Sequence, residues 1–280
     1  MTPKVSENEI REFIRRYYAE LASGHSCCPT MSIYTQQCGS STFSRDKLND
    51  IPKGSSLGLG CGNPVSFASI RKGETIVDLG SGGGLDCFLA SKRVGKKGKV
   101  IGVDMTPEMV KRAKENARKG KYSNVEFRLG EIENLPIEDD VADLVISNCV
   151  INLSTNKRRV FKEAYRVLKP GGRLVVSDIV LQDKLPEAIE ESINAYARCV
   201  AGAVLREEYL AMIRDAGFEN VRPVEEVSYP ISYINLNDPI LATVLKKLNI
   251  SKEQALNSLH SSLKVLSITV YGQKPIYTNQ

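Results

Sequence analysis

Strands and helices alternate regularly between residues 75 and 178, and this alternation restricts the possible folds more than any other feature of the sequence. Runs of apolar, often β-branched residues predict strands at Thr75–Leu79, Val100–Val103, Val125–Leu129, Leu144–Ser147 and Arg173–Asp178. Helices are predicted between them at Leu85–Val94, Pro107–Arg118 (with Thr106 as N-cap) and Lys157–Leu168, with a turn at 169–172. This order is typical of a parallel sheet that helices cover on both faces.

The segments on either side of this alternation carry weaker patterns. Apolar residues at three- and four-residue steps predict a helix at Glu7–Ser23, followed by an irregular stretch up to residue 72. After the core we expect helices at Pro186–Val200 and Arg206–Ala216, strands at Asn220–Val227 and Leu263–Gly272, and an irregular or helical insertion between these strands. We therefore divide the chain into an N-terminal helical extension (1–72), a core (73–182), two helices with a sixth strand (183–227), and a C-terminal insertion with the last strand (228–280).

Composition and charge exclude several classes of protein. The 280 residues are 42% hydrophobic and 25% charged, as in ordinary globular proteins. No apolar run approaches the ~20 residues of a membrane span, and Met1–Arg16 lacks the apolar segment of a signal peptide, so we expect a cytoplasmic protein without a membrane partner. The net charge is +5, but acidic residues interrupt the basic runs and Trp is absent, which favours solvated faces over a nucleic-acid surface.

A glycine-rich loop, Asp78-Leu-Gly-Ser-Gly-Gly-Gly84, joins the first predicted strand to its helix. Glycine lets the main chain turn sharply and lets a ligand approach it closely. The second strand ends at Asp104, where a carboxylate can accept hydrogen bonds from both ribose hydroxyls of a nucleoside. The third strand is followed by Gly130-Glu-Ile-Glu133, which offers an acceptor for an adenine amino group. The glycine spacing differs from that of dinucleotide-binding loops, and Asp78 would repel a pyrophosphate but suits a cationic amino-acid group.

These motifs, with Gly-Val-Asp-Met at 102–105 and Leu-Lys-Pro-Gly-Gly-Arg at 168–173, resemble those of the Rossmann-like, class I S-adenosylmethionine-dependent methyltransferases. The resemblance covers roughly residues 73–178 and implies an α/β fold with a seven-stranded sheet whose last strand is antiparallel. It also implies S-adenosylmethionine as the cofactor. The residues that we expect at the cofactor site are Asp78, Gly80, Ser81, Gly82, Gly84, Asp104, Met105, Glu131, Ile132 and Asn148.

The chain contains seven cysteines, and in a reducing compartment such an odd set indicates thiols, metal ligands or redox groups rather than structural disulfides. Cys149 follows the fourth strand, and ligands bind at the carboxyl ends of the strands in parallel sheets. Cys61 lies in a glycine-rich stretch before the core, and Cys199 near the end of the helix after the fifth strand. The three form no local metal-binding motif, so only the fold can bring them together. We assign Cys87 to the core, among apolar residues of the first core helix.

Three cysteine-containing segments resemble signatures of the arsenite methyltransferases: Leu-Gly-Leu-Gly-Cys61-Gly-Asn-Pro-Val, Ser-Asn-Cys149-Val-Ile-Asn-Leu and Cys199-Val-Ala-Gly-Ala. The resemblance covers roughly residues 55–217 and implies that these thiolates bind trivalent arsenic, as arsenite or methylarsenite. A further upstream cysteine is implied to join a redox cycle in which thioredoxin or glutathione restores the thiols. Cys27 and Cys28 occupy about the right place, and Cys38 is a weaker candidate.

We hypothesise that Cys149 and Cys199 form the minimal arsenic site, with Cys61 and Cys27 or Cys28 as the third thiol or the resolving cysteine. The scarcity of histidine agrees with arsenic as the acceptor. Only two histidines are present, both outside the core motifs, whereas methylation of oxygen or nitrogen usually requires a general base. The lone pair of trivalent arsenic attacks a sulfonium methyl group directly, and soft thiolates suit such a centre.

Two other functions use the same residues differently. A small-molecule O- or C-methyltransferase would share the fold and predicts that cysteine substitutions are mild. A non-catalytic metalloid- or zinc-binding sensor would use Cys61, Cys149 and Cys199 as ligands but leaves Asp78 and Asp104 without a role. A monomer is the default expectation for any of these.

Overall fold

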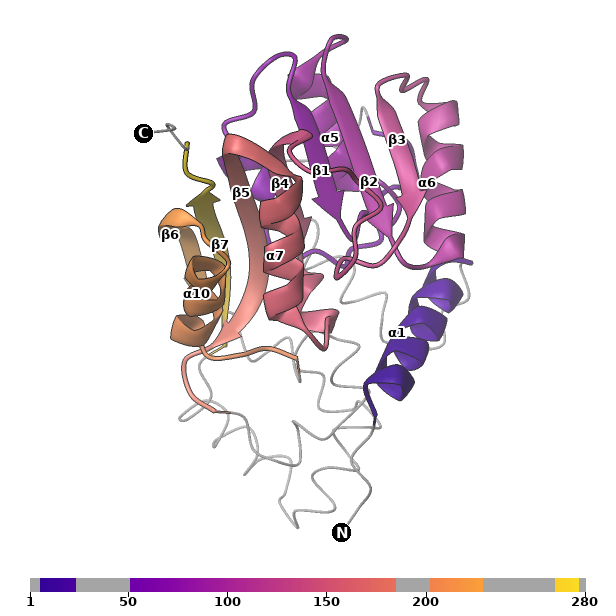
Figure 1. The fold of residues 1–280 in the computed structure, drawn as a ribbon. Coiled ribbons are helices and arrows are strands. Elements are labelled where there is room, and N and C mark those ends of the chain that lie inside the picture. Colours follow the sequence, from indigo (N-terminus) through magenta and orange to yellow (C-terminus); the bar gives the residue numbers. More distant parts are fainter. Residues whose placement is uncertain (1–5, 24–50, 185–201, 229–264, 277–280) are drawn as a thin grey trace.

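A seven-stranded sheet with helices on both faces forms the centre of the molecule (Figure 1). The computed structural model describes residues 6–23, 51–184, 202–228 and 265–276. In space the strands follow the order β3-β2-β1-β4-β5-β7-β6. Their bounds are β1 Thr75–Leu79, β2 Lys99–Asp104, β3 Val125–Leu129, β4 Ala142–Asn148, β5 Leu168–Leu181, β6 Glu219–Ser228 and β7 Val265–Gln273.

Strand β7 runs against its neighbours, whereas β1 to β5 pair in parallel. It inserts between β5 and β6 and pairs antiparallel with both, so that on β5 the register runs from Arg173 opposite Gln273 to Leu181 opposite Val265. The predicted class, an α/β sheet of seven strands whose last strand is antiparallel, is confirmed. The Val and Ile residues of β1, β4 and β5 are almost fully buried, as expected for strands that are covered on both faces.

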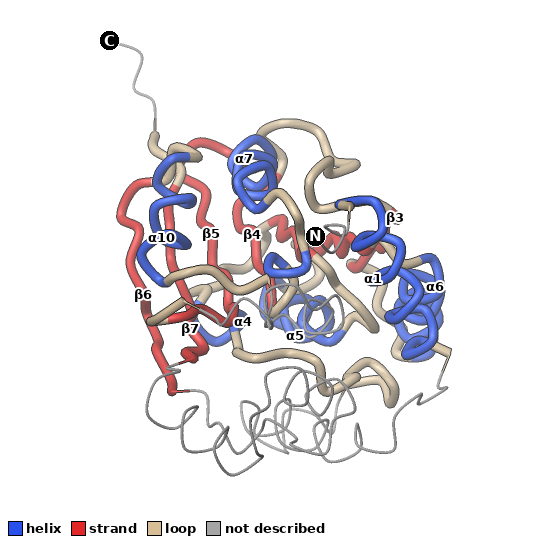
Figure 2. The backbone as a smooth tube through the Cα atoms, turned by 90° about the horizontal axis from the view of Figure 1, so that it is seen from below, coloured by secondary structure: helices blue, strands red, loops and turns tan. Residues whose placement is uncertain are grey.

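Two layers of helices pack their apolar sides against the sheet (Figure 2). On one face lie α4 (Pro64–Phe67), α5 (Leu85–Val94) and α6 (Pro107–Lys119), and on the other α7 (Lys157–Val167) and α10 (Arg206–Asp215). The short 3₁₀ turn η1 (Ile151–Leu153) follows β4, and α1 (Glu7–Ala22) packs beside α6. At the start of α1, Ser6 and Glu9 form a reciprocal capping box, which satisfies two backbone N–H groups of the first turn.

The predicted elements within the described residues are confirmed, and their ends differ by no more than two residues except at one strand. That exception is β5, which begins at Leu168, so the turn predicted at 169–172 is wrong. Gly171 does adopt a left-handed φ of 79°, but its N–H donates to the carbonyl of Lys274, and the N–H of Lys274 donates to Gly172. Pairing with the segment after β7 therefore extends the strand through the Pro-Gly-Gly sequence.

Several predictions fall on residues outside the described part of the chain. These are the helix at 186–200, the insertion before the last strand, and the cysteines Cys27, Cys28, Cys38 and Cys199. Among the described residues, no helix has both the length and the apolar character that crossing a membrane requires.

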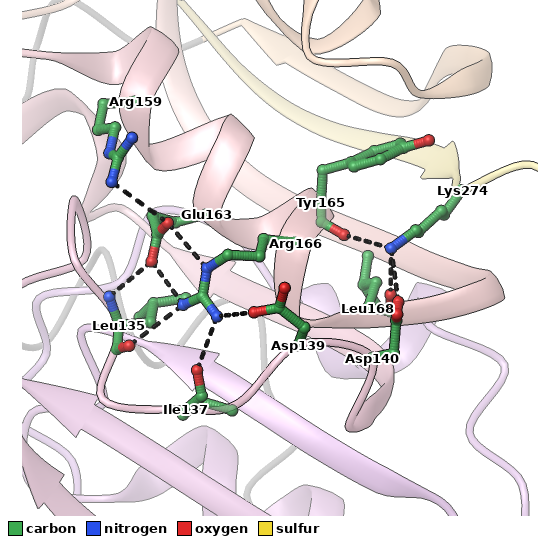
Figure 3. Close-up of polar contacts among 10 residues, drawn as sticks. All are labelled: Leu135, Ile137, Asp139, Asp140, Arg159, Glu163, Tyr165, Arg166, Leu168 and Lys274. Atoms are coloured by element: carbon green, nitrogen blue, oxygen red, sulfur yellow. Dashed lines mark hydrogen bonds and ion pairs between the residues drawn. The ribbon is translucent and has the colours of Figure 1, made fainter.

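The amino ends of β4 and β5 are fixed by a network of polar contacts (Figure 3). Arg166 of α7 donates to the carboxylate of Glu163 at 2.7 Å and to the carbonyl of Ile137 at 2.9 Å. Lys274 donates to Asp140 and to the carbonyl of Leu168, both at 2.7 Å. Burial is the largest single influence on the pKa of Glu163 and raises it. The hydrogen bonds from Arg166 and from the N–H of Leu135, together with the charges of Arg166 and Arg159, outweigh burial and hold this pKa below its ordinary value. We call this set of contacts the amino-end network.

Candidate functional site

A pocket opens at the carboxyl ends of β1, β2 and β4, the end of a parallel sheet where ligands bind. The predicted residues that line it are Asp78, Gly80, Ser81, Gly82, Asp104, Met105, Glu131, Ile132, Asn148 and Cys149. Two predicted residues lie just behind its wall. Gly84 is the N-cap of α5, and Cys61 sits between the lining residues Gly60 and Gly62. The fold thus brings together residues that the sequence separates by up to ninety positions.

The glycine loop needs its glycines for two different reasons. Gly80 has a φ of 69°, and a Cβ there would lie 2.2 Å from Val150, so the loop packs against the turn after β4. Gly84 has a φ of 94°, and a Cβ there would meet Phe88 at 2.7 Å. Gly82, by contrast, faces open space, with nothing within 4 Å of its Cβ position. The main chain at Gly82 is therefore exposed to a ligand in the pocket.

Asp104 at the end of β2 is held in a fixed orientation. Its two carboxylate oxygens accept hydrogen bonds from the N–H groups of Gly82 and Thr106, each at 2.9 Å. Burial raises the pKa of Asp104, while these backbone donors lower it. A carboxylate can accept about four hydrogen bonds, and the side chain of Thr106 also bonds to Asp104, so Asp104 keeps capacity for a ligand hydroxyl.

Two further carboxylates, those of Asp78 and Asp86, lie at the glycine loop, and their negative charges repel each other. The thiol of Cys87 donates to Asp78 at 3.1 Å, yet burial and the nearby Asp86 raise the pKa of Asp78 well above its ordinary value. Burial also raises the pKa of Asp86 to about 6, against the effect of a hydrogen bond from Asn148. Within the described residues, Asp86 Oδ1 and Ser81 Oγ are buried without a hydrogen-bond partner. A cationic ligand would relieve this repulsion and satisfy these atoms.

Helix α1 lines one side of the pocket and forms ion pairs with the acidic segment after β3. Arg15 lies 3.3 Å and Arg11 3.8 Å from the carboxylate of Glu131. Glu133 accepts a hydrogen bond from Ser154 at 2.5 Å. The carboxylate of Glu131, predicted as an acceptor for adenine, thus faces the arginines of α1 in this structure.

Cys149 occupies a strained position directly after β4. Its φ is 59°, which residues with a side chain rarely adopt, and its N–H donates to the carbonyl of Ser177 at 2.8 Å. The same carbonyl accepts a hydrogen bond from the thiol of Cys61 at 3.7 Å. Both cysteines therefore gather around one backbone oxygen of β5. Strained residues of this kind cluster at functional sites, where the surrounding structure enforces them.

The loop that carries Cys61 is seated closely on β4 and β5. A Cβ at Gly60 would lie 2.8 Å from the side chain of Asn148, and one at Gly62 would lie 2.5 Å from Ser177. Ser267 of β7 donates to the carbonyl of Cys61 at 2.8 Å. The glycines on either side of Cys61 are thus required for the approach that brings its thiol to the carboxyl end of the sheet.

Comparison with known proteins agrees with this arrangement. Residues 70–217 match a family described as a methyltransferase domain. A curated arsenite methyltransferase from Aquipseudomonas alcaligenes is 34% identical over 84% of this chain and 68% of its own length. The chain belongs to the arsenite methyltransferase family. Membership in this family confirms the resemblance that the three cysteine segments indicated.

Two further relatives differ in the share of their own length that this chain covers. The one from Halobacterium salinarum is 46% identical over 227 residues, which are 76% of this chain but 58% of that protein. The chain thus spans less than two thirds of the length of that relative. A crystal structure of an arsenic(III) S-adenosylmethionine methyltransferase from Chlamydomonas reinhardtii superposes with a TM-score of 0.63 and 32% identity, covering 91% of this chain and 76% of that one.

Several residues that line this pocket were not predicted from the sequence. Arg11, Ile14 and Tyr18 of α1 line it, as do residues 55–59 and Asp86. The helix pattern of α1 gave no indication of which element it covers. Asp86 lies two residues after the glycine loop, and that spacing was the available signal.

A buried carboxylate behind the cysteines was also missed. Tyr209 of α10 donates to Asp178 at 2.8 Å, and burial raises the pKa of Asp178 to about 7. The charges of Cys61 and Cys149 contribute to a raised pKa of Tyr209, after burial and Asp178 itself.

Proposed function

We propose that the protein transfers a methyl group from S-adenosylmethionine to trivalent arsenic held by cysteine thiolates. One observation carries the proposal. The pocket lined by Asp78, Asp86 and Asp104 has Cys149 in its wall. The N–H of Cys149 and the thiol of Cys61 both donate to the carbonyl of Ser177. A site for a cationic nucleoside and a pair of thiols therefore adjoin each other. The family membership supports the same reaction.

The residues present fit S-adenosylmethionine. Asp104 would accept the ribose hydroxyls, the exposed main chain at Gly82 would contact the amino-acid part, and Asp78 with Asp86 would face its positive charge. Met105 and Ile132 offer apolar contact to the adenine ring. When bound, the cofactor supplies a methyl group on a positively charged sulfur. The protein's task is to hold this group in line with the acceptor and to exclude water.

The thiols would hold arsenic by replacing its hydroxyl groups. Cys149 is 7% exposed, so a centre bound there is shielded from water on most sides. Each thiol loses its proton on binding, and the released hydroxyl leaves as water. Cys199, which lies outside the described residues, is proposed as the further ligand. The bound arsenic keeps its lone pair, which needs no general base to attack the methyl carbon.

Methyl transfer converts arsenic(III) to arsenic(V), and a reductant must complete the cycle. We propose that two thiols, one of them Cys27 or Cys28, give up two electrons to the methylated arsenic and form a disulfide. Thioredoxin or glutathione then reduces that disulfide. Such a cycle requires the reducing conditions of the cytoplasm.

The decisive experiment incubates the reduced protein with arsenite, labelled S-adenosylmethionine and a thiol reductant, and then separates the arsenic species. We expect methylated arsenic with the wild type and none with Cys149→Ser, although the variant still binds the cofactor. Equal activity of Cys149→Ser would overturn the arsenic site. If the wild type bound the cofactor but methylated no arsenic, the acceptor would be an oxygen or carbon of a small molecule.

A further inference from the structure

Asn148, the last residue of β4, lies between the carboxylates and the cysteines and uses its whole side-chain amide to join them. Its Oδ1 accepts hydrogen bonds from the N–H groups of Cys61 and Gly62, both at 3.2 Å. Its Nδ2 donates to the carbonyl of Gly62 at 3.0 Å and to Asp86 Oδ2 at 2.9 Å. Two acceptor and two donor positions are the full capacity of an amide, so within the described residues all hydrogen-bonding positions of Asn148, which is predicted at the cofactor site, are used by the protein itself.

The amide is planar and rigid, so its two ends cannot turn independently. Fixing Nδ2 on Asp86 also fixes the direction in which Oδ1 meets the Cys61 loop. That loop has little other freedom at this point, because a Cβ at Gly60 would already lie 2.8 Å from Nδ2 of Asn148. A change in the position of Asp86 is therefore transmitted to the backbone of Cys61.

Asp86 is the member of this series of hydrogen bonds whose ionisation a bound ligand can change. It is 8% exposed, lines the pocket, and its Oδ1 is buried without a partner among the described residues. A cation beside Oδ1 favours the ionised carboxylate. The bond from Asn148 to Oδ2 then becomes a charge-assisted hydrogen bond, which is about twice as strong as a neutral one.

We propose that Asn148 is a positioning residue that couples the two sites: a cationic cofactor on Asp86 holds Asn148, and Asn148 holds the Cys61 loop beside Cys149. The inference rests on the proposed function for the identity of the cofactor. Coupling of this kind is reciprocal, so an occupied cysteine site also tightens cofactor binding.

The test measures how fast iodoacetamide alkylates each cysteine, by mass spectrometry, in the absence of arsenic. In the wild type, saturating S-adenosylmethionine should slow alkylation of Cys61 about tenfold, within the usual range of coupling between sites. In Asn148→Ala the slowing of Cys61 should fall to less than about twofold, at a cofactor concentration that saturates the variant. Cys149 lines the pocket and is the internal reference, since the cofactor shields it directly in every variant.

Two nearly isosteric variants guard against a general loss of structure. Asn148→Asp keeps an acceptor for the Cys61 and Gly62 N–H groups but places a negative charge against Asp86, so the cofactor effect on Cys61 should be lost in a folded protein. Asp86→Asn keeps the shape but not the charge, and should weaken the effect in the same way. Equal slowing of Cys61 in the wild type and in all three variants would overturn the coupling. Because no arsenic is used, a failure of arsenic methylation and a failure of the coupling are separate results.

Discussion

The two ends of the sheet differ in how completely their polar groups are paired. At the amino end, the amino-end network joins α7, the segment before β4 and the segment after β7 through Glu163, Arg166 and Lys274 (Figure 3). At the carboxyl end, Ser81, Asp86, Asn152 and Asp178 keep buried polar atoms without partners among the described residues, and Cys149 has a left-handed backbone. At the amino end, Arg173 Nε also lacks a partner within the described residues. The amino end is thus satisfied largely by the protein itself, whereas the carboxyl end holds more unpaired polar atoms that a ligand could satisfy.

This difference indicates that polar groups at the amino end stabilise the fold, whereas those at the carboxyl end are arranged for binding. Carboxylates at the amino end have donors on each side, so their ionised forms stabilise the fold. Carboxylates at the carboxyl end lie close to one another, and their raised pKa values mean that ionisation costs folding energy until a cation arrives. Substitutions at the two ends should therefore have opposite consequences.

The largest effect is expected for Asp104→Ala. The substitution removes the acceptor that we propose for the ribose of the cofactor, and it removes the acceptor for the N–H groups of Gly82 and Thr106. S-adenosylmethionine should bind about 100-fold more weakly, as expected for lost hydrogen bonds to a charged group. The free energy of unfolding should change by less than about 1 kcal/mol, since burial already opposed this charge. Calorimetric titration measures the affinity for the cofactor, and urea unfolding measures the free energy of unfolding. A large loss of stability with unchanged affinity would contradict the assignment of the carboxyl end to binding.

Glu163→Gln should show the reverse. It weakens the bonds from Arg166 and from the N–H of Leu135 to a side chain that is 4% exposed, and should lower the free energy of unfolding by about 2 kcal/mol. Cofactor affinity should stay unchanged, because Glu163 does not line the pocket. Thermal unfolding and a binding titration on the same sample test this prediction. A loss of affinity in the folded variant would show that the two ends are linked.

Asp86→Asn should change the pH dependence of stability with the opposite sign to Glu163→Gln. The folded-state pKa of Asp86 is about 6, above its ordinary value of 3.8, so ionisation destabilises the fold at neutral pH, and lowering the pH from about 6 to 4 removes this cost. The variant should therefore be more stable than the wild type by about 1–2 kcal/mol at pH 7 and similar at pH 4.

Glu163, whose folded-state pKa is lowered, gives stability that is present above its ordinary pKa of 4.5 and is lost as the pH falls further. In Glu163→Gln the deficit should therefore shrink in acid. Urea unfolding at a series of pH values separates the two curves. If the free energies of unfolding of the two variants changed in the same way with pH, the electrostatic difference that we infer between the two ends would be contradicted.

The smallest effect is expected for Arg15→Ala. The side chain of Arg15 is 47% exposed, and its ion pair with Glu131 should contribute less than about 0.5 kcal/mol to stability. Cofactor dissociation should accelerate by about twofold at most, because Ile14 keeps α1 in place. Stopped-flow measurement of cofactor release tests this. A tenfold acceleration would mean that the ion pairs, rather than apolar packing, keep α1 over the pocket.

The fold, and the grouping of residues such as Asp78 and Asp104 around one pocket, could be predicted because their signals are local. The strand bounds follow from short apolar runs, and Asp78, Gly82 and Asp104 lie in motifs at strand ends, where parallel topology brings them together. Asn148 was placed at the pocket correctly, but its hydrogen bonds go to the Cys61 loop and to Asp86. A sequence shows where an amide stands along a strand but not which loop returns to meet it.

What the sequence did not predict depends on contacts between distant segments. The seating of the Cys61 loop on Ser177 and Ser267, the ion pairs of Glu131 with α1, and the Tyr209–Asp178 hydrogen bond all join residues that no motif relates. The extension of β5 through Pro170 has the same origin, since it depends on pairing with Lys274. Local propensity favours a turn there, and the tertiary partner overrides it.

The place of β7 between β5 and β6 has a consequence for the order of events during synthesis. A growing chain can align β1 to β5 as soon as they are made, but β5 keeps an unpaired edge until residues 265–273 arrive. The hydroxyl that anchors the carbonyl of Cys61 belongs to Ser267 and arrives with them. The thiol site is thus one of the last parts to be assembled, so a partly made chain exposes its cysteines before it can position them.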